Sequence, residues 1–148
     1  MDPLFLLLNL PPSRQPDICT PVLIVDDDDA MRETLAQALV RAGYLVLQCT
    51  DGSHVLKVLE KQHVDLLITD LFMEETDGLA TIMKVRKERP EMKIIAMSGG
   101  GSLTDNDYLP IASRLGAHRT LHKPFNAAVL LETIHRLLPP PGNIDSSG

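Results

Sequence analysis

The 148-residue chain contains no tryptophan, and aromatic residues make up only 3% of it. Its hydrophobic core must therefore be built from Leu, Val, Ile, Ala and Met, which supply most of the 44% hydrophobic share. An aliphatic core of this kind suits strands that are buried on both faces and covered by helices. The length allows one domain with its own core and is too short for two ordinary domains.

Cysteines and long apolar runs are also scarce. Cys19 and Cys49 form no CxxC pair and have no histidine at zinc-finger spacing, so we expect two free thiols in a reducing cytoplasm. The apolar run Leu4–Leu10 has only about a third of the length that spans a bilayer. No Lys or Arg precedes it and two prolines follow, which is a poor match to a signal peptide. We expect residues 1–20 to be a disordered leader or an artificial extension, and we expect no membrane partner.

Basic charge is in the minority, with 14 Lys and Arg against 20 Asp and Glu and a net charge of −6. Five of the 20 acids are Asp70 and the four residues of the run Asp26–Asp29, and without them 15 acids face 14 bases. The acidity is therefore concentrated in one run and one further residue. Binding of nucleic acid requires a basic face, so we expect none by this domain.

Five short apolar runs alternate with five segments of helical periodicity. The runs are Val22–Val25, Leu45–Leu47, Leu66–Thr69, Ile94–Met97 and a weaker one at Thr120–His122. Most are continuous rather than alternating in polarity, which indicates strands covered on both faces. This order predicts an α/β fold of five βα units with a parallel sheet. We expect the domain to cover residues 21–138 and the Pro/Gly/Ser-rich residues 139–148 to form a disordered tail.

Capping residues predict where the first two helices begin and end. The first is expected to begin near Asp28 or Asp29 and to stop at Gly43. The second is expected to run from a capping Ser53 to Lys61.

Proline and further capping residues delimit the other three helices. The third is expected to begin after Asp77 and Gly78 and to be halted by Pro90. The fourth covers about 106–115, where Pro110 predicts a later start or an irregular helix. The fifth is expected to begin at a capping Asn126 and to reach 139.

Polar side chains stand at the ends of four expected strands. The first strand is followed by Asp26–Asp29, the third by Asp70, the fourth by Ser98 and the fifth by Lys123. In an open parallel sheet, ligands bind beyond the carboxyl ends of the strands. Carboxylates, a hydroxyl and an ammonium group are therefore expected to converge on one rim.

This set of groups suits phosphoryl transfer. Crowded carboxylates repel one another, and Mg²⁺ relieves the repulsion while keeping waters and binding phosphate oxygens. A carboxylate such as Asp70 can attack phosphorus and form an aspartyl phosphate. Mg²⁺, Lys123 and Ser98 would then stabilise the charge that develops on the transferred group.

Each residue also has a structural alternative. The run Asp26–Asp29 can cap a helix and complement its dipole, and Asp70 can begin a turn. Ser98 can cap a helix, and Lys123 can be a solvated loop residue. The coincidence of all four at predicted strand ends favours the functional interpretation.

Four segments resemble, in order, the motifs of bacterial response-regulator receiver domains over about residues 20–138. They are Val22–Asp28, Asp70–Gly78, Ile94–Gly99 and Lys123–Phe125. The resemblance implies a flavodoxin-like (βα)5 doubly wound five-stranded parallel sheet with strand order 2-1-3-4-5. It also implies a cis peptide bond before Pro124.

The resemblance assigns roles to individual residues. It implies that Asp70 is the phosphoacceptor, that Asp27 binds Mg²⁺ directly and that Asp26 acts mainly through bound water. The backbone carbonyl of Phe72 would be a further metal ligand. Ser98 would respond to phosphorylation, and Lys123 would complete the site.

The chain departs from the family pattern in several places. Glu74 stands where proline is usual, and Thr120 stands where an aromatic residue usually moves on activation. A glycine-rich stretch at 99–102 suggests a mobile loop and is not followed by the Lys-Ser/Thr of a Walker motif. Neither Phe72 nor Gly100 can orient a water by hydrogen bonding, so we expect slow loss of the phosphoryl group.

The resulting hypothesis is a signalling switch in a two-component phosphorelay rather than an enzyme. A histidine kinase or phosphotransfer protein would phosphorylate Asp70, and the change would shift a surface formed by the fourth helix, fifth strand and fifth helix. A downstream protein or output domain would read that surface. One alternative is an enzyme, a phosphatase or phosphotransferase with an Asp nucleophile, although such enzymes more often have a second carboxylate at the position of Phe72. The other is a receiver-like module that is no longer phosphorylated.

Overall fold

The computed structural model describes residues 20–73, 77–99 and 105–138. Within these ranges five parallel strands form one sheet in the order β2-β1-β3-β4-β5, as predicted. The strands are β1 Pro21–Val25, β2 Leu45–Cys49, β3 Leu66–Asp70, β4 Lys93–Ser98 and β5 Arg119–His122. The helices are α2 Asp29–Arg41, η1 Gly52–His54, α3 Val55–Lys61, α4 Gly78–Glu88, α5 Asp105–Leu115 and α6 Ala127–Leu137.

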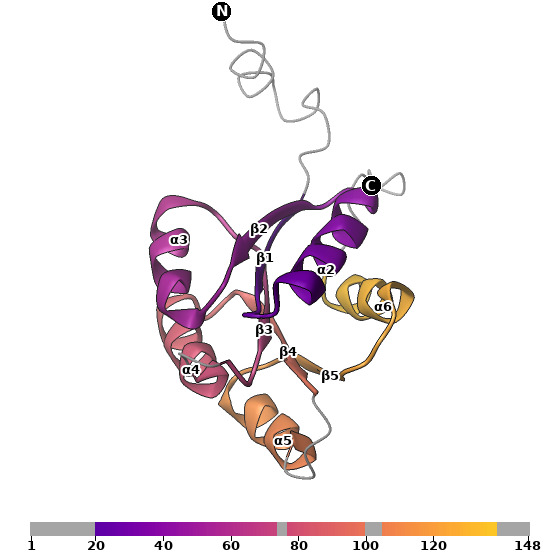
Figure 1. Cartoon of the computed structure of the whole chain (residues 1–148). Coiled ribbons are helices and arrows are strands. Elements are labelled where there is room, and N and C mark those ends of the chain that lie inside the picture. Colours follow the sequence, from indigo (N-terminus) through magenta and orange to yellow (C-terminus); the bar gives the residue numbers. More distant parts are fainter. Residues whose placement is uncertain (1–19, 74–76, 100–104, 139–148) are drawn as a thin grey trace, which may run out of the picture.

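The helices cover both faces of the sheet (Figure 1). Helices α2 and α6 pack on one face, where their side chains share a core with Val22 and Ile24 of β1. Helices α3, α4 and α5 pack on the other face, against Leu23 and Val25 of the same strand. All four of these β1 residues are fully buried. Burial on both faces explains why the strand sequence is continuously apolar, and the predicted doubly wound fold is confirmed.

Local signals set most helix ends as predicted. Asp28 caps α2 by accepting a hydrogen bond from the backbone N–H of Met31 at 3.2 Å. Gly43 follows that helix with φ of 99°, a conformation that favours glycine. Asp77 caps α4 and Asn126 caps α6 in the same way.

One expectation about helix ends is wrong. Ser53 is not a cap, because the segment begins with the short η1 turn and Asp51 accepts the hydrogen bond from the Ser53 N–H at 2.7 Å. The bounds predicted for the fourth helix are confirmed by α5, which begins at Asp105 with Pro110 inside it rather than starting later. The hydrogen bond that Pro110 cannot donate would reach only the first turn of the helix, which limits its cost. In the described part of the chain, no helix has the length and apolar character needed to cross a membrane.

Candidate functional site

Three aspartates converge at the carboxyl end of the sheet. Carboxylate oxygens of Asp26, Asp27 and Asp70 all lie within 4.8 Å of one another. Asp26 follows β1 directly and Asp70 ends β3, and these strands are neighbours in the sheet. Asp26 is fully buried and Asp70 is 6% exposed, whereas Asp27 is exposed to solvent. The convergence that the sequence predicted for these side chains is therefore present.

Lys123 lies between the two buried carboxylates. Its Nζ atom donates to Asp26 Oδ2 at 2.8 Å and lies 3.5 Å from Asp70 Oδ2. Lys123 follows β5 directly, and the peptide bond between Lys123 and Pro124 is cis, as predicted. The backbone N–H of Lys123 also donates to the carbonyl of Ser98 at 2.6 Å. A side chain at Gly99 would collide with the side chain of Lys123, so glycine permits this close approach.

Burial and charge shift the ionisation of these groups in a consistent way. Burial raises the pKa of Asp70, the charge of Lys123 opposes this, and the charge of Asp26 adds to it, so that the pKa is raised overall to about 6. Burial alone would lower the pKa of Lys123. The hydrogen bond to Asp26 and the charges of Asp70 and Asp26 outweigh that effect, so the Lys123 pKa is raised overall. The pocket therefore holds an ammonium group next to a carboxylate that is costly to ionise.

Backbone hydrogen bonds hold Leu71 and Gly78, which lie on either side of the segment between β3 and α4. The N–H of Leu71 donates to the carbonyl of Met97 at 2.9 Å, and the N–H of Gly78 donates to the carbonyl of Leu71 at 3.1 Å. A side chain at Gly78 would collide with the carbonyl oxygen of Asp70, so α4 begins in direct contact with the loop. The N–H of Phe72 faces Asp70 Oδ1 at 3.5 Å. Glu74 lies outside the described residues.

Ser98 ends β4 beside the pocket and is fully buried. It pairs in register with His122 of β5, the residue that precedes Lys123. Thr120, which occupies the position of the expected aromatic residue, is half-buried on β5. Gly100, by contrast, lies outside the described residues, and so do residues 101 and 102 of the glycine-rich stretch.

Arg32 lies near this site but was not predicted from the sequence. This arginine is buried on the inner face of α2, where its guanidinium donates to the Asp26 carbonyl at 2.9 Å and to Gln48 Oε1 at 3.0 Å. It also forms an ion pair with Asp29 at 2.7 Å. Its spacing of three and seven residues from Leu35 and Leu39 was an available signal for an inward position.

The donor set fits a hard divalent cation. Three carboxylates within reach of one point are the oxygen ligands that Mg²⁺ accepts. A cation there would also favour the ionised form of Asp70, whose ionisation is otherwise opposed by burial and by Asp26.

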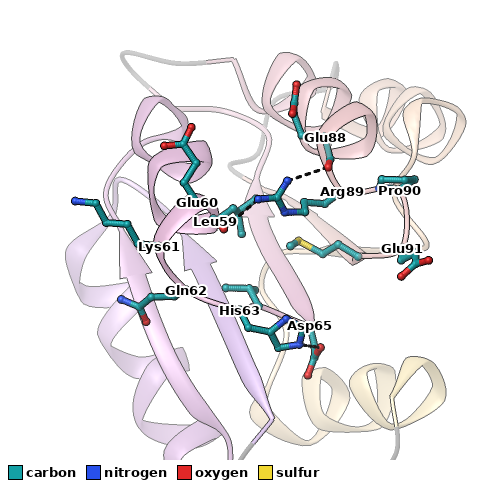
Figure 2. Close-up of a pocket in the computed structure, with 12 residues that line it drawn as sticks. Leu59, Glu60, Lys61, Gln62, His63, Asp65, Glu88, Arg89, Pro90 and Glu91 are labelled. Atoms are coloured by element: carbon teal, nitrogen blue, oxygen red, sulfur yellow. Dashed lines mark hydrogen bonds and ion pairs between the residues drawn. The ribbon is translucent and has the colours of Figure 1, made fainter.

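A cavity of about 690 Å³ lies away from this site, between the C-terminal ends of α3 and α4 (Figure 2). In it, Arg89 donates to the carbonyls of Leu59 at 3.2 Å and Glu88 at 3.0 Å. His63 contacts Asp65 at 2.6 Å, and Asp65 immediately precedes β3. The cavity therefore lies at the amino ends of the strands and includes none of the acidic pocket. The candidate site lies at the opposite, carboxyl ends of the strands, where the buried carboxylates and Lys123 meet.

Known proteins have similar sequences and a similar fold. A family model described as the response regulator receiver domain matches residues 22–135. The transcriptional regulatory protein GlrR of Escherichia coli (strain K12) is 34% identical over 113 residues, which cover 76% of this chain and 25% of that protein. The response regulator receiver protein CpdR of Brucella abortus (strain 2308) is 30% identical over 117 residues, covering 79% of this chain and 95% of that protein.

Solved structures agree with these relatives. A CheY-like receiver domain protein from Methanospirillum hungatei JF-1 superposes with a TM-score of 0.73 at 30% identity, covering 81% of this chain and 94% of that one. The chemotaxis response regulator CheY4 of Vibrio cholerae gives a TM-score of 0.71 at 29% identity, covering 82% and 100%. This chain spans about a quarter of the length of GlrR and of several other relatives it matches. With the family model covering most of the domain, the chain belongs to the response regulator receiver domains of two-component signalling systems.

Proposed function

We propose that Asp70 accepts a phosphoryl group from a histidine kinase or phosphotransfer protein, and that Mg²⁺ assists the transfer. The observation that carries this proposal is the approach of three aspartate carboxylates to within 4.8 Å, with Lys123 bridging the two buried ones. Such crowding of like charge opposes folding unless a cation or a chemical role compensates for it.

The carboxylate of Asp70 would act as the nucleophile. One of its oxygens forms a bond to phosphorus while the P–N bond of a phosphohistidine donor breaks, and the electron pair stays on the imidazole nitrogen, which takes up a proton. Lys123 stabilises the negative charge on the transferred oxygens. Ser98 donates its hydroxyl to one of them after transfer.

The metal would be held by the side chains of Asp26, Asp27 and Asp70 and by the backbone carbonyl of Phe72. When bound, Mg²⁺ would supply positive charge to the phosphoryl oxygens. The buried Asp26 accepts from the N–H of Asp28 at 3.0 Å and from Lys123, so its carboxylate is held in a fixed orientation. The exposed Asp27 is free of the burial that would hinder direct ligation.

Phosphorylation would shift the surface formed by α5, β5 and α6. Ile111 of α5 and Val129 of α6 are 40% and 41% exposed. A shallow groove between β5 and α6 is lined in part by Thr120, Phe125 and Val129. Because the chain spans a quarter of regulators such as GlrR, the reader of this surface would be an output domain or a separate downstream protein. We place this signalling in the cytoplasm, without nucleic-acid contact by this domain, which the net charge of −6 supports.

Incubation with acetyl phosphate and Mg²⁺ tests the proposal by intact mass. We expect a gain of about 80 Da, the mass of one phosphoryl group, that requires Mg²⁺. Asp70→Asn should abolish the gain and Asp27→Asn should reduce it. Asp65→Asn is the matched control, because Asp65 lies at the opposite end of the sheet next to β3. Absence of any gain in the unmodified sequence, or a gain that survives in Asp70→Asn, would refute the proposal.

A further inference from the structure

Two of the chain's few aromatic rings contact each other beside the acceptor site. The rings of Phe72 and Tyr108 pack edge to face, with their centroids 5.0 Å apart and an interplanar angle of 86°. Phe72 lies two residues after Asp70, and Tyr108 lies on α5. The contact therefore joins the acceptor loop to a helix of the proposed interaction surface.

Within the described residues, the backbone contacts of Phe72 are weaker than those of its neighbour. Leu71 is fixed by hydrogen bonds on both sides, to Met97 and Gly78. Phe72 itself has an isolated antiparallel bridge to Asp77 and an N–H at 3.5 Å from Asp70 Oδ1, the long limit of a hydrogen bond. Its side chain is at the surface, where the residue is 38% exposed. The ring of Tyr108 therefore contacts a side chain that is otherwise partly open to solvent.

The other partner of the contact belongs to a helix that packs on the core. Tyr108 packs against the core cluster that includes Ala112 of the same helix, which is fully buried. Helix α5 also lies against β4, β5 and α4. A displacement of the Tyr108 ring would therefore be carried by a whole helix and reach the exposed Ile111 one turn further on.

We propose that Tyr108 is a positioning residue for the phosphorylation site. Its ring holds Phe72 so that the carbonyl of Phe72 is available to the metal, and in return it carries occupancy of the site to α5. Thr120 offers no ring for this purpose, and the chain provides the aromatic contact on α5 instead. This inference rests on the function proposed above. Coupling between two sites is reciprocal, so loss of the ring should weaken metal binding, and metal binding should change the surroundings of the ring.

The tyrosine content of the chain allows a direct optical test. Trp is absent, and Tyr44 and Tyr108 are the two tyrosines of the chain. The Tyr44 hydroxyl is buried and has no hydrogen-bond partner among the described residues, so Tyr44→Phe should leave the fold intact and leave Tyr108 as the sole emitter. In this background we expect Mg²⁺ with acetyl phosphate to change the tyrosine emission, and the change to saturate with Mg²⁺.

The emission and the intact mass are measured on the same sample, which separates the two proposals. A mass gain without an emission change would overturn the role of Tyr108 and leave the proposed function standing. The absence of a mass gain would overturn both. Asp70→Asn in the same background should show neither the mass gain nor the part of the emission change that depends on acetyl phosphate.

Variants at Tyr108 test the reverse direction of the coupling. In Tyr108→Leu, which lacks the ring, the Mg²⁺ dissociation constant measured by titration calorimetry should rise by up to about tenfold, the range expected for one aromatic pair. Tyr108→Phe keeps the ring and should restore binding to near the original value. Ser113→Ala, at an exposed position of the same helix outside the ring contact, should leave it unchanged. Equal Mg²⁺ affinity in Tyr108→Leu and the unmodified sequence, or equal loss in Tyr108→Phe, would contradict the inference.

Discussion

At the scale of single residues, the pocket places buried carboxylates close together, which costs free energy of folding unless a compensating role offsets it. Asp70 is held near Asp26 with little exposure to water, and Lys123 is the ammonium group placed between them. The guanidinium of Arg32 also helps to hold Asp26 in place, because it donates a hydrogen bond to the Asp26 carbonyl. The presence of the aspartates and Lys123 could be predicted from strand ends. The Phe72–Tyr108 contact could not, because it depends on the position of α5 and no local pattern encodes it.

The raised pKa of Asp70, about 6, predicts a pH-dependent cost to the metal-free fold. Between pH 4 and 6 the folded protein binds more protons at Asp70 than the unfolded chain, so the free energy of unfolding falls as pH rises through this window. We expect Asp70→Asn to be more stable than the unmodified sequence by about 1–2 kcal/mol at pH 7 without Mg²⁺, after allowance for solvent screening.

Urea unfolding across pH 4–8 measures the difference. The advantage of Asp70→Asn should shrink toward pH 4, where the carboxyl is protonated in the folded protein and about half protonated in the unfolded chain, and should also shrink at pH 7 when Mg²⁺ is added. A stability difference that is independent of pH would contradict this account.

Removal of the Arg32 guanidinium should be costly, because it leaves the buried carbonyl of Asp26 without this donor. We expect Arg32→Met to lower the free energy of unfolding by about 1–3 kcal/mol, since the Asp26 carbonyl and Gln48 Oε1 lose their hydrogen bonds. Arg41→Met, in the exposed last turn of the same helix, is the control and should change stability by less than about 0.5 kcal/mol. Equal stability of the two variants would show that Arg32 is not needed to hold the backbone at Asp26.

At the scale of helices and strands, local signals predicted more than periodicity did. Asn126 caps α6 as predicted, and Asp28 and Asp77 cap α2 and α4 next to the starts predicted for these helices, because a cap acts within its own turn. Apolar spacing is less informative, since the apolar residues Met83 of α4 and Val129 of α6 are 53% and 41% exposed. Spacing defines a face, but the neighbouring helices decide how much of that face is covered, and this is not a local property.

The start of α4 is an element-scale constraint on the acceptor loop. A Cβ atom at Gly78 would meet the carbonyl of Asp70 and the backbone of Leu71, which are not flexible side-chain ends. We expect Gly78→Ala to cost about 1–3 kcal/mol in stability and to reduce phosphorylation by acetyl phosphate.

Gly116→Ala is the matched comparison for this variant. Gly116 follows α5 with φ of 137°, so alanine is strained there too, but the site lies away from the acceptor loop. It should lose stability and keep its phosphorylation rate under conditions where both variants are folded. Phosphorylation at the same rate in both variants would contradict a specific role for Gly78.

At the scale of the whole molecule, the sheet brings together groups that lie far apart in sequence. Hydrogen bonding across the strand order 2-1-3-4-5 places β1 next to β3 and β5 beyond β4. Alternation of strands and helices was sufficient to predict a parallel sheet. The strand order came from the family resemblance, because periodicity does not specify which strands are neighbours.

The lifetime of the phosphorylated state is a property of the assembled switch. No side-chain hydrogen-bonding group is available at Phe72 to orient an attacking water, so we expect the phosphorylated protein to persist for minutes or longer. Phe72→Asn should shorten the lifetime by supplying an amide. Phe72→Leu, which removes the ring without adding a polar group, is its control. Decay of intact phosphoprotein mass measures both, and a half-life of seconds in the unmodified sequence would reject the expectation.

The central claim is that Asp70 is the residue that carries the phosphoryl group. Borohydride reduction of the protein after treatment with acetyl phosphate and Mg²⁺, followed by peptide sequencing in a mass spectrometer, tests it most directly, because an aspartyl phosphate is reduced to homoserine. We predict homoserine in place of Asp70 and unchanged aspartate at Asp26 and Asp27. Homoserine at either of those two positions, or at none of the three, would contradict the account.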